Sequence, residues 1–153
     1  MTEMRWRHYL GLAAMTVMMF LAMYVLMYAM VDRFENVFSN INQFYMAGLM
    51  TAPMVLIELA MMRGMYESRT ANMAIVAVCL MALMGFWFGI RQQFAVTDGQ
   101  FLRSMIPHHG GAVLMCSKAP IQDSEIKTLC QDIVRSQQSE IELMKRIMSR
   151  LKV

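Results

Sequence analysis

Two histidines, two methionines and a cysteine lie close together in the stretch MIPHHGGAVLMC, residues 105–116. Thioethers and imidazoles are soft ligands that together favour Cu(I), and Ag(I) by the same argument. Thioethers bind hard cations such as Mg²⁺ and Ca²⁺ poorly, whereas Zn²⁺ prefers thiolate, imidazole or carboxylate ligands. The stretch therefore predicts a copper site, with silver as a second metal and zinc as a weaker alternative.

The backbone around the two histidines departs from what a helix favours. Pro107 removes a helical hydrogen bond, and Gly110 and Gly111 lower helix stability through backbone entropy. Such departures tend to mark functional or strained sites. Adjacent residues on a helix point about 100° apart, so we expect His108 and His109 to face different neighbours. The alternative is that one histidine is a core residue and that the methionines only pack.

Two amphipathic helices must position these residues. Thr97 or Asp98 suits a helix N-cap, Pro120 ends the first helix, and Asp123 suits the second N-cap. The apolar stripe of the first helix is Leu102, Met105, His109, Ala112 and Cys116. The seam of the second helix is Ile126, Cys130, Ile133, Gln137, Glu140, Met144, Ile147 and Leu151. The pattern predicts an antiparallel helical hairpin over residues 97–153.

Two polar residues interrupt the apolar seam of the second helix. Gln137 and Glu140 need partners if they are buried. In an antiparallel hairpin they lie level with Met105 and His109, so polar and sulfur groups would converge in one layer. A single hairpin has a small core. We therefore expect a homodimer that completes a four-helix bundle, or packing against other helices of the chain.

The first part of the chain is expected to cross a membrane. Hydrophobic residues make up 58% of the 153 residues and charged residues 16%, which is unusually apolar for a soluble domain. Three apolar runs, about 9–31, 44–62 and 72–90, each approach the roughly 20 residues that span a bilayer as a helix. The sequence predicts an all-α chain with a three-span membrane domain, 1–92, followed by the hairpin domain.

Basic residues indicate the orientation of the spans. Arg5 and Arg7 precede the first run, and Arg63 and Arg69 lie between the second and third. Because cytoplasmic loops carry an excess of Lys and Arg, we expect a cytoplasmic N-terminus and a C-terminal domain outside the cytoplasm. In a bacterial inner membrane that domain is periplasmic. The net charge of +3 is spread thinly, so no nucleic-acid partner is expected.

A two-part motif resembles a known family. Residues 98–116 read D-x-x-F-L-R-S-M-I-P-H-H-x-x-A-x-x-M-C, and residues 129–144 read L-C-x-x-I-V-x-S-Q-x-x-E-I-x-x-M. This pattern closely resembles the family called domain of unknown function 305, whose best-known member type is the CopM-like periplasmic copper-binding protein. The resemblance covers about residues 97–151. It implies a helical domain that binds copper, and sometimes silver, through Met and His.

The resemblance also implies a set of metal ligands. These are Met105, His108, His109, Met115 and Met144. Met148, one turn further, is a candidate by geometry alone. Asp98, Gln137 and Glu140 match motif positions and are candidates for hydrogen bonding to a ligand. Many members of the family are soluble exported proteins, so the three spans are a departure from the family pattern.

The chain has three cysteines. Cys116 and Cys130 lie on facing stripes of the predicted hairpin, and outside the cytoplasm a disulfide between them is reasonable. The alternatives are a thiolate pair that binds Cu(I) and two free thiols. Cys79 lies in the third apolar run, where we expect it to be buried.

Methionines recur in the predicted spans. The first span carries Met15, Met19, Met23 and Met27, and the second carries Met46, Met50 and Met54. Residues four apart share a helix face, so these are ladders of thioethers, although Met also packs well in apolar surroundings. With the G-x-x-x-G of Gly85 to Gly89, which allows close helix packing, the pattern resembles the three-span copper permeases.

We therefore expect a membrane-anchored periplasmic copper-binding protein for copper tolerance, storage or handover, working beside other copper-handling proteins. The alternative is an oligomeric, Met-lined copper transporter. A third possibility is a structural protein whose methionines are incidental. An enzyme is not expected, because the sequence contains no nucleophile–base pair, phosphate loop or redox-cofactor motif.

Overall fold

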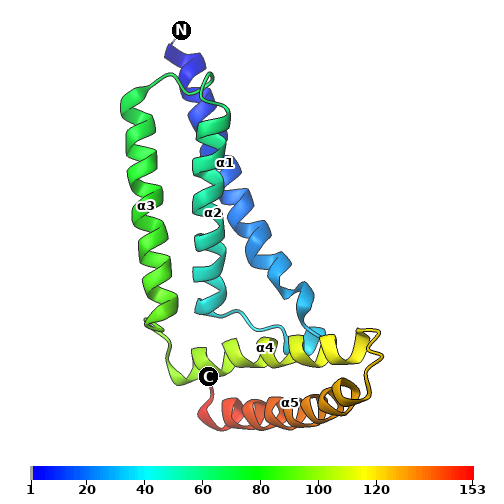
Figure 1. Ribbon diagram of the computed structural model, residues 1–153. Helices are drawn as coiled ribbons and strands as arrows, with labels where there is room; N and C mark the ends of the chain where they lie inside the picture. The colour runs from blue at the N-terminus through cyan, green and yellow to red at the C-terminus, as the bar shows by residue number, and fades with distance from the viewer. Residues whose placement is uncertain (1) are drawn as a thin grey trace. The chain divides into compact units, whose positions relative to one another are not determined.

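The computed structural model describes residues 2–153, with side chains from residue 6 onward, and it is helical throughout (Figure 1). The α-helices are α1 (Thr2–Leu26), α2 (Ile41–Met61), α3 (Arg69–Arg91), α4 (Asp98–Lys118) and α5 (Ser124–Leu151). Two short 3₁₀-helices, η1 (Met27–Met30) and η2 (Phe34–Asn36), lie between α1 and α2. No strand occurs within residues 2–153, so the predicted all-α class is confirmed.

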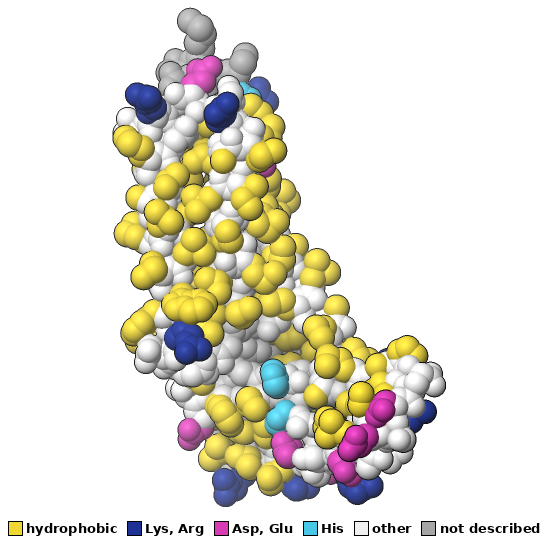
Figure 2. Space-filling model, viewed as in Figure 1, with side chains coloured by type: hydrophobic (Ala, Val, Ile, Leu, Met, Phe, Trp, Pro, Cys, Tyr) yellow, Lys and Arg dark blue, Asp and Glu magenta, His cyan; other side chains and the backbone are white. Residues whose placement is uncertain are grey.

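Three helices are long and apolar enough to cross a membrane: Trp6–Met30, Ile41–Met61 and Arg69–Arg91. They overlap the three predicted runs, so the prediction of three span-like helices is confirmed. In Figure 2 apolar side chains cover the visible face of these helices, and charged side chains gather near their ends. The side chain of Arg5, which the orientation argument uses, lies outside the described side chains, and the orientation itself stays a prediction.

The chain divides into two compact units. The first comprises Met1–Leu26 and Asn42–Ala95, and the second comprises Met27–Ile41 and Val96–Val153. The segment 27–41, here called the connector, joins α1 to α2 but packs against α4 through η1 and η2. The predicted membrane domain, 1–92, includes the connector, whereas in the structure the connector belongs to the second unit. No residue pattern within the connector indicates that it packs against α4.

The core of the first unit draws on all three of its helices. Its buried members are Leu12, Val55, Leu59, Tyr66 and Cys79. Cys79 is a free, buried thiol, as expected. The two glycines of the G-x-x-x-G pattern differ in their surroundings: a Cβ on Gly89 would lie 3.1 Å from the Tyr45 ring, whereas one on Gly85 would meet no described atom within 4 Å. Of these two glycines, only Gly89 therefore serves close packing within this unit.

In the second unit α4 and α5 lie side by side (Figure 1). The predicted N-caps are confirmed. The Thr97 hydroxyl accepts the N–H of Gln100, and the Asp123 carboxylate accepts the N–H groups of Glu125 and Ile126 at 2.9 and 3.0 Å. Each cap satisfies backbone donors that the first helical turn leaves unpaired. These caps define where both helices begin.

The buried face of α4 is rotated relative to the predicted stripe. The buried α4 residues are Gly99, Leu102, Ile106, Gly110 and Val113. Those of α5 are Ile141, Met144 and Met148. The predicted stripe does face α5, because Met105 packs on the shared core, His109 contacts Glu140 and Cys116 is bonded to Cys130. Beyond Leu102, however, the most deeply buried residues each lie one position later than the prediction, because α4 contacts α5 on one side and the connector on another. The ends of the predicted α5 seam are also exposed, Ile126 by 48% and Leu151 by 43%, because α5 has 28 residues and α4 has 21.

The contact with the connector explains the two glycines after the histidines. A Cβ on Gly110 would lie 2.6 Å from Asp32 Oδ1 and 3.3 Å from Val31 Cγ1. Asp32 is held there because Oδ1 accepts the side-chain N–H of buried Asn36 at 2.7 Å. A Cβ on Gly111 would lie 3.5 Å from the Met30 carbonyl oxygen, an ordinary contact. Gly110 therefore lets the connector approach α4 closely.

We predict that Gly110→Ala destabilises the second unit by about 1–3 kcal/mol, the usual range for overpacking. The added methyl group would displace the Asp32 carboxylate from its contact with Asn36. Amide hydrogen exchange in α4 measures the effect. Gly111→Ala is the matched control, which we expect to be neutral or stabilising by up to about 1 kcal/mol because Ala favours helix over Gly. Equal effects of the two substitutions would contradict the connector contact.

Candidate metal site

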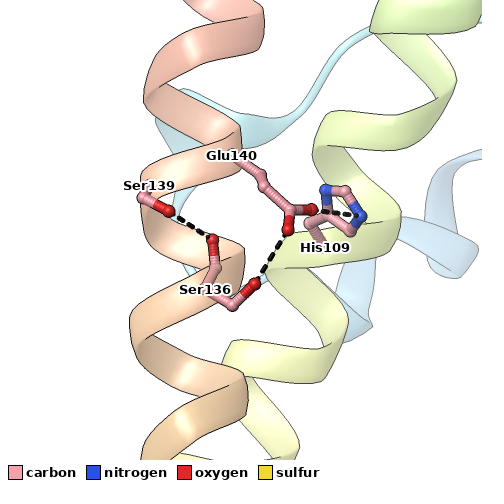
Figure 3. A network of polar contacts seen from close by, with 4 residues as sticks. All are labelled: His109, Ser136, Ser139 and Glu140. Atoms are coloured by element: carbon pink, nitrogen blue, oxygen red, sulfur yellow. Dashed lines mark hydrogen bonds and ion pairs between the residues drawn. The ribbon is translucent and has the colours of Figure 1, made fainter.

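The candidate site centres on a contact between α4 and α5. His109 Nε2 lies 3.5 Å from Glu140 Oε2, and the side chains are 12% and 46% exposed (Figure 3). The other carboxylate oxygen, Oε1, accepts the Ser136 hydroxyl at 2.8 Å. The Ser139 hydroxyl in turn donates to the Ser136 carbonyl at 2.8 Å. A nearly buried imidazole is thus paired with a half-exposed carboxylate that has its own hydrogen-bond donor.

The second ring nitrogen of His109, Nδ1, lacks the polar neighbour that Nε2 has. Nδ1 is buried and has no hydrogen-bond partner among the described residues. Burial lowers the pKa of His109, and the His108 ring adds to that effect, while Glu140 opposes it. The imidazole is therefore neutral near pH 7, with one protonated nitrogen and one lone pair. A neutral imidazole is the form that binds metals.

Three of the predicted methionine ligands belong to the core between α4 and α5. Met144 and Met148 are buried in the core of the second unit, and Met105 packs against the same core. Met105 precedes His109 by one turn on α4, and Met144 follows Glu140 by one turn on α5, so each thioether lies on the same stripe as its neighbour. Phe38 of the connector borders this cluster. The convergence of sulfur and imidazole groups in one layer stays a prediction.

The remaining predicted ligands lie elsewhere. His108 is exposed, with its ring centroid 6.1 Å from that of His109. Met115 is 56% exposed. Asp98 is exposed in the first turn of α4, and Gln137 is half-buried on α5. The helix turns adjacent residues away from one another, so His109 faces α5 and His108 does not.

The two cysteines of the second unit are joined. Cys116 and Cys130 form a disulfide with their Cα atoms 5.1 Å apart. Among the alternatives considered, the disulfide is therefore confirmed. A disulfide sulfur is not a thiolate, so this pair is not a Cu(I) site while it is oxidised. The bond instead ties the end of α4 to the first turns of α5.

Nitrogen, thiolate and carboxylate ligands are sparse around His109. No group of three or more His, Cys, Asp or Glu side chains gathers closely enough to hold a metal within the described part of the chain. Structural zinc sites usually take four such ligands. A site at His109 would instead combine one imidazole with thioethers, the ligand set that favours Cu(I).

The methionine ladders do not line the space between the spans. A groove of about 710 Å³ opens between α1, α2 and α3. It is lined by side chains such as Leu12, Thr16, Phe20, Val55 and Phe86, and by no methionine among the described residues. Met46, Met50 and Met54 are instead 38–39% exposed on the outside of α2. The path between the three helices of one chain is therefore apolar but lacks thioethers.

Sequence reasoning missed the connector as part of the site's surroundings. Asp32 and Phe38 both pack on the α4–α5 pair, Asp32 at Gly110 and Phe38 at the core that includes the methionines. The signal that could have found them is the glycine pair itself, because adjacent glycines inside a helix indicate the close approach of another backbone. Their partner segment could not be read from the pattern.

Comparison with known proteins agrees with the motif. Residues 89–148 match the model of a family described as domain of unknown function (DUF305). The chain is also 33% identical over 117 residues to an uncharacterised protein of Acanthamoeba polyphaga mimivirus, a match that covers 74% of each chain. The chain belongs to the DUF305 family. The DUF305 match contains His109, Glu140 and the three clustered methionines, and the viral match is long enough to include part of the span-like helices. No solved structure matches the chain.

Proposed function

We propose that this DUF305 protein is a membrane-anchored copper-binding protein. It captures Cu(I), and Ag(I) by the same chemistry, for copper tolerance, storage or handover to other copper-handling proteins. The observation that carries the proposal is the buried, unpartnered Nδ1 of His109, on a helix pair whose core includes three methionines. A buried polar atom without a partner is unfavourable by about 1–3 kcal/mol, and a metal bound at the lone pair would remove that penalty.

The neighbouring groups fit a soft monovalent ion. Thioethers bind Cu(I) without adding charge, and a neutral imidazole completes the set. The carboxylate of Glu140, on the far side of the ring, supplies one negative charge nearby. Met105 and Met144 are the nearest thioethers along the two helices, and Met148 lies one turn further. We assign these residues to the site, with His108 and Met115 outside it in the single chain.

The three span-like helices suit a role as an anchor in the lipid bilayer. Under the positive-inside argument the second unit lies on the periplasmic side of a bacterial inner membrane. The periplasm is oxidising, so the disulfide between the two helices would persist there. Ile126 and Leu129 are 48% and 57% exposed on α5. A second copy that covers them would complete a four-helix bundle, so we propose a homodimer.

A Met-lined permease has less support. The groove between the spans of one chain has no methionine among its described lining residues, so a thioether path would have to form between copies. The exposed methionines of α2 are available for that, but they are equally suited to contact with lipid. The binding role needs only groups that lie together within one unit.

A titration of the full-length chain in detergent tests the proposal. We expect the protein to take Cu(I) from a competing chromophoric chelator and to bind Zn²⁺ much more weakly. Replacing Met105 and Met144 together by Leu should lower the Cu(I) affinity at least about tenfold while preserving the fold, since Leu and Met have similar volumes. The matched control is Met81→Leu with Met84→Leu, which changes two exposed methionines of α3. Absence of Cu(I) binding, or equal losses in both variants, would overturn the proposal.

A further inference from the structure

Both carboxylate oxygens of Glu140 have a polar neighbour, and one of these neighbours is the His109 ring. Glu140 can therefore influence which ring nitrogen of His109 is free to bind a metal. Oε1 accepts the hydroxyl of Ser136, one turn earlier on α5, and Oε2 faces His109 Nε2. Figure 3 shows the carboxylate placed between the serine and the ring. The serine orients a carboxylate that is otherwise half-exposed, so that one oxygen stays directed at the imidazole.

A neutral imidazole carries its proton on one nitrogen only, and the surroundings of His109 distinguish the two. With the proton on Nε2, the protonated nitrogen lies 3.5 Å from an anionic oxygen, and the lone pair is on the buried Nδ1. With the proton on Nδ1, that N–H has no acceptor among the described residues, and the Nε2 lone pair opposes a carboxylate. Both effects favour the proton on Nε2.

We propose that Glu140 is a positioning residue that holds the proton of His109 on Nε2, so that Nδ1 is the atom presented to the metal. This inference rests on the proposed copper-binding function. Glu140 then interacts with Nε2, on the opposite side of the ring from the metal at Nδ1, and so Glu140 is not itself a metal ligand. A carboxylate in that place increases the basicity of the donor nitrogen and sets the orientation of the ring.

The separation of 3.5 Å defines how the pair acts. It is longer than an ordinary N–H···O hydrogen bond of about 2.9–3.0 Å, so in the metal-free chain the carboxylate acts chiefly through its charge. A metal on Nδ1 withdraws electron density from the ring and makes Nε2–H a stronger donor. Metal binding is therefore expected to shorten this contact, and a small rotation of the half-exposed Glu140 side chain suffices for that.

The first test reads the tautomer in the metal-free protein. Full-length chain with ¹⁵N-labelled histidines is studied in detergent near pH 7, and the His109 signals are identified by their loss in His109→Gln. We expect Nδ1 to show the shift of an unprotonated nitrogen and Nε2 that of a protonated one. In Glu140→Ala we expect a shift toward a mixture of the two tautomers. A wild-type ring protonated on Nδ1, or a tautomer unaffected by Glu140→Ala, overturns the inference.

The second test reads Cu(I) affinity in a matched series. Glu140→Ala should lower the affinity about 10–100-fold, the usual effect of removing a hydrogen-bond partner of a metal ligand. Glu140→Gln, whose carbonyl oxygen still accepts the N–H, should recover part of that loss. Ser139→Ala is the control, because its hydroxyl contacts the Ser136 carbonyl and not the carboxylate, and it should match wild type.

The two tests separate this inference from the proposed function. If the wild-type chain binds no Cu(I), the proposed function fails, whereas the tautomer still decides the role of Glu140 in the metal-free chain. If wild type binds Cu(I) but Glu140→Ala binds it equally well, Glu140 has no positioning role. If Glu140→Gln loses as much affinity as Glu140→Ala while both fold normally, residue 140 accepts no hydrogen bond from Nε2 in the metal-bound protein, which also overturns the inference.

Discussion

His109→Ala is expected to lower the affinity of the full-length chain for Cu(I) by at least about 100-fold, because losing a ligand costs at least as much as losing its hydrogen-bond partner. His108→Ala is expected to leave the affinity nearly unchanged. The motif places the two histidines side by side, and the resemblance implies both as ligands. The predicted stripe already placed His109 toward the second helix, and in the structure His109 contacts Glu140 of α5 while His108 is exposed.

The physical basis is the burial of one ring and the exposure of the other. The His109 side chain is 12% exposed, with one nitrogen facing Glu140 and the other unpartnered. His108 is exposed on the neighbouring face of α4. An exposed imidazole already has water as a partner, so a metal gains less there. Competition with a chromophoric Cu(I) chelator measures both variants, and each serves as the other's control.

Equal losses in the two variants would contradict the single-chain site. A large loss in His108→Ala alone would point to a site shared between copies, because that ring faces outward. Circular dichroism of both variants is needed beside the titration, since His109 is nearly buried and its removal leaves a small cavity. His109→Gln retains a polar side chain and tests whether the loss comes from the ring nitrogen.

Removing the disulfide is expected to destabilise the α4–α5 pair by about 3 kcal/mol, the value for a closed loop of about 15 residues. Cys116 and Cys130 are 14 residues apart in sequence, so the bond restricts the loop between the helices in the unfolded ensemble. The effect is large relative to the core of the pair, which has five buried members. The double substitution Cys116→Ser and Cys130→Ser tests it.

Amide hydrogen exchange in α4 and α5 is the suitable measurement, because it reports local opening without unfolding the span-like helices. A loss of about 3 kcal/mol corresponds to roughly 100-fold faster exchange of the most protected amides. Reductant should produce the same change in wild type and none in the double variant. Cys79→Ala, in the other unit, is the control. Unchanged exchange in the double variant would show that helix packing alone holds the pair.

Much of the fold could be predicted because its signals are local. The three span-like helices follow from the length and composition of apolar runs, which a bilayer-spanning helix requires. The starts of α4 and α5 follow from Thr97 and Asp123, whose side chains pair with N–H groups within three residues. The family could be recognised for a related reason, since its motif lies on two consecutive helices.

The rotation of α4 could not be predicted from the same pattern. Periodicity identifies an apolar face only when a helix has one partner. Here Val31 and Asp32 of the connector, 79 and 78 residues earlier in the chain, pack against Gly110 on another side. This moved Ile106 into the core, fully buried, and left Met105 at its border. The only local sign of this long-range contact in the α4 sequence is Gly110, the residue that permits it.

The sequence by itself determined the helices, the span-like runs, the soft ligand types and the family, because each depends on residue chemistry within one or two turns. Only the tertiary structure decided that Cys116 and Cys130 are joined, that Nδ1 of His109 is left without a partner, and which methionines are buried between the two helices. Those outcomes depend on how two helices are rotated about their axes. That rotation is determined by the sum of contacts with α5 and the connector, which no single segment encodes.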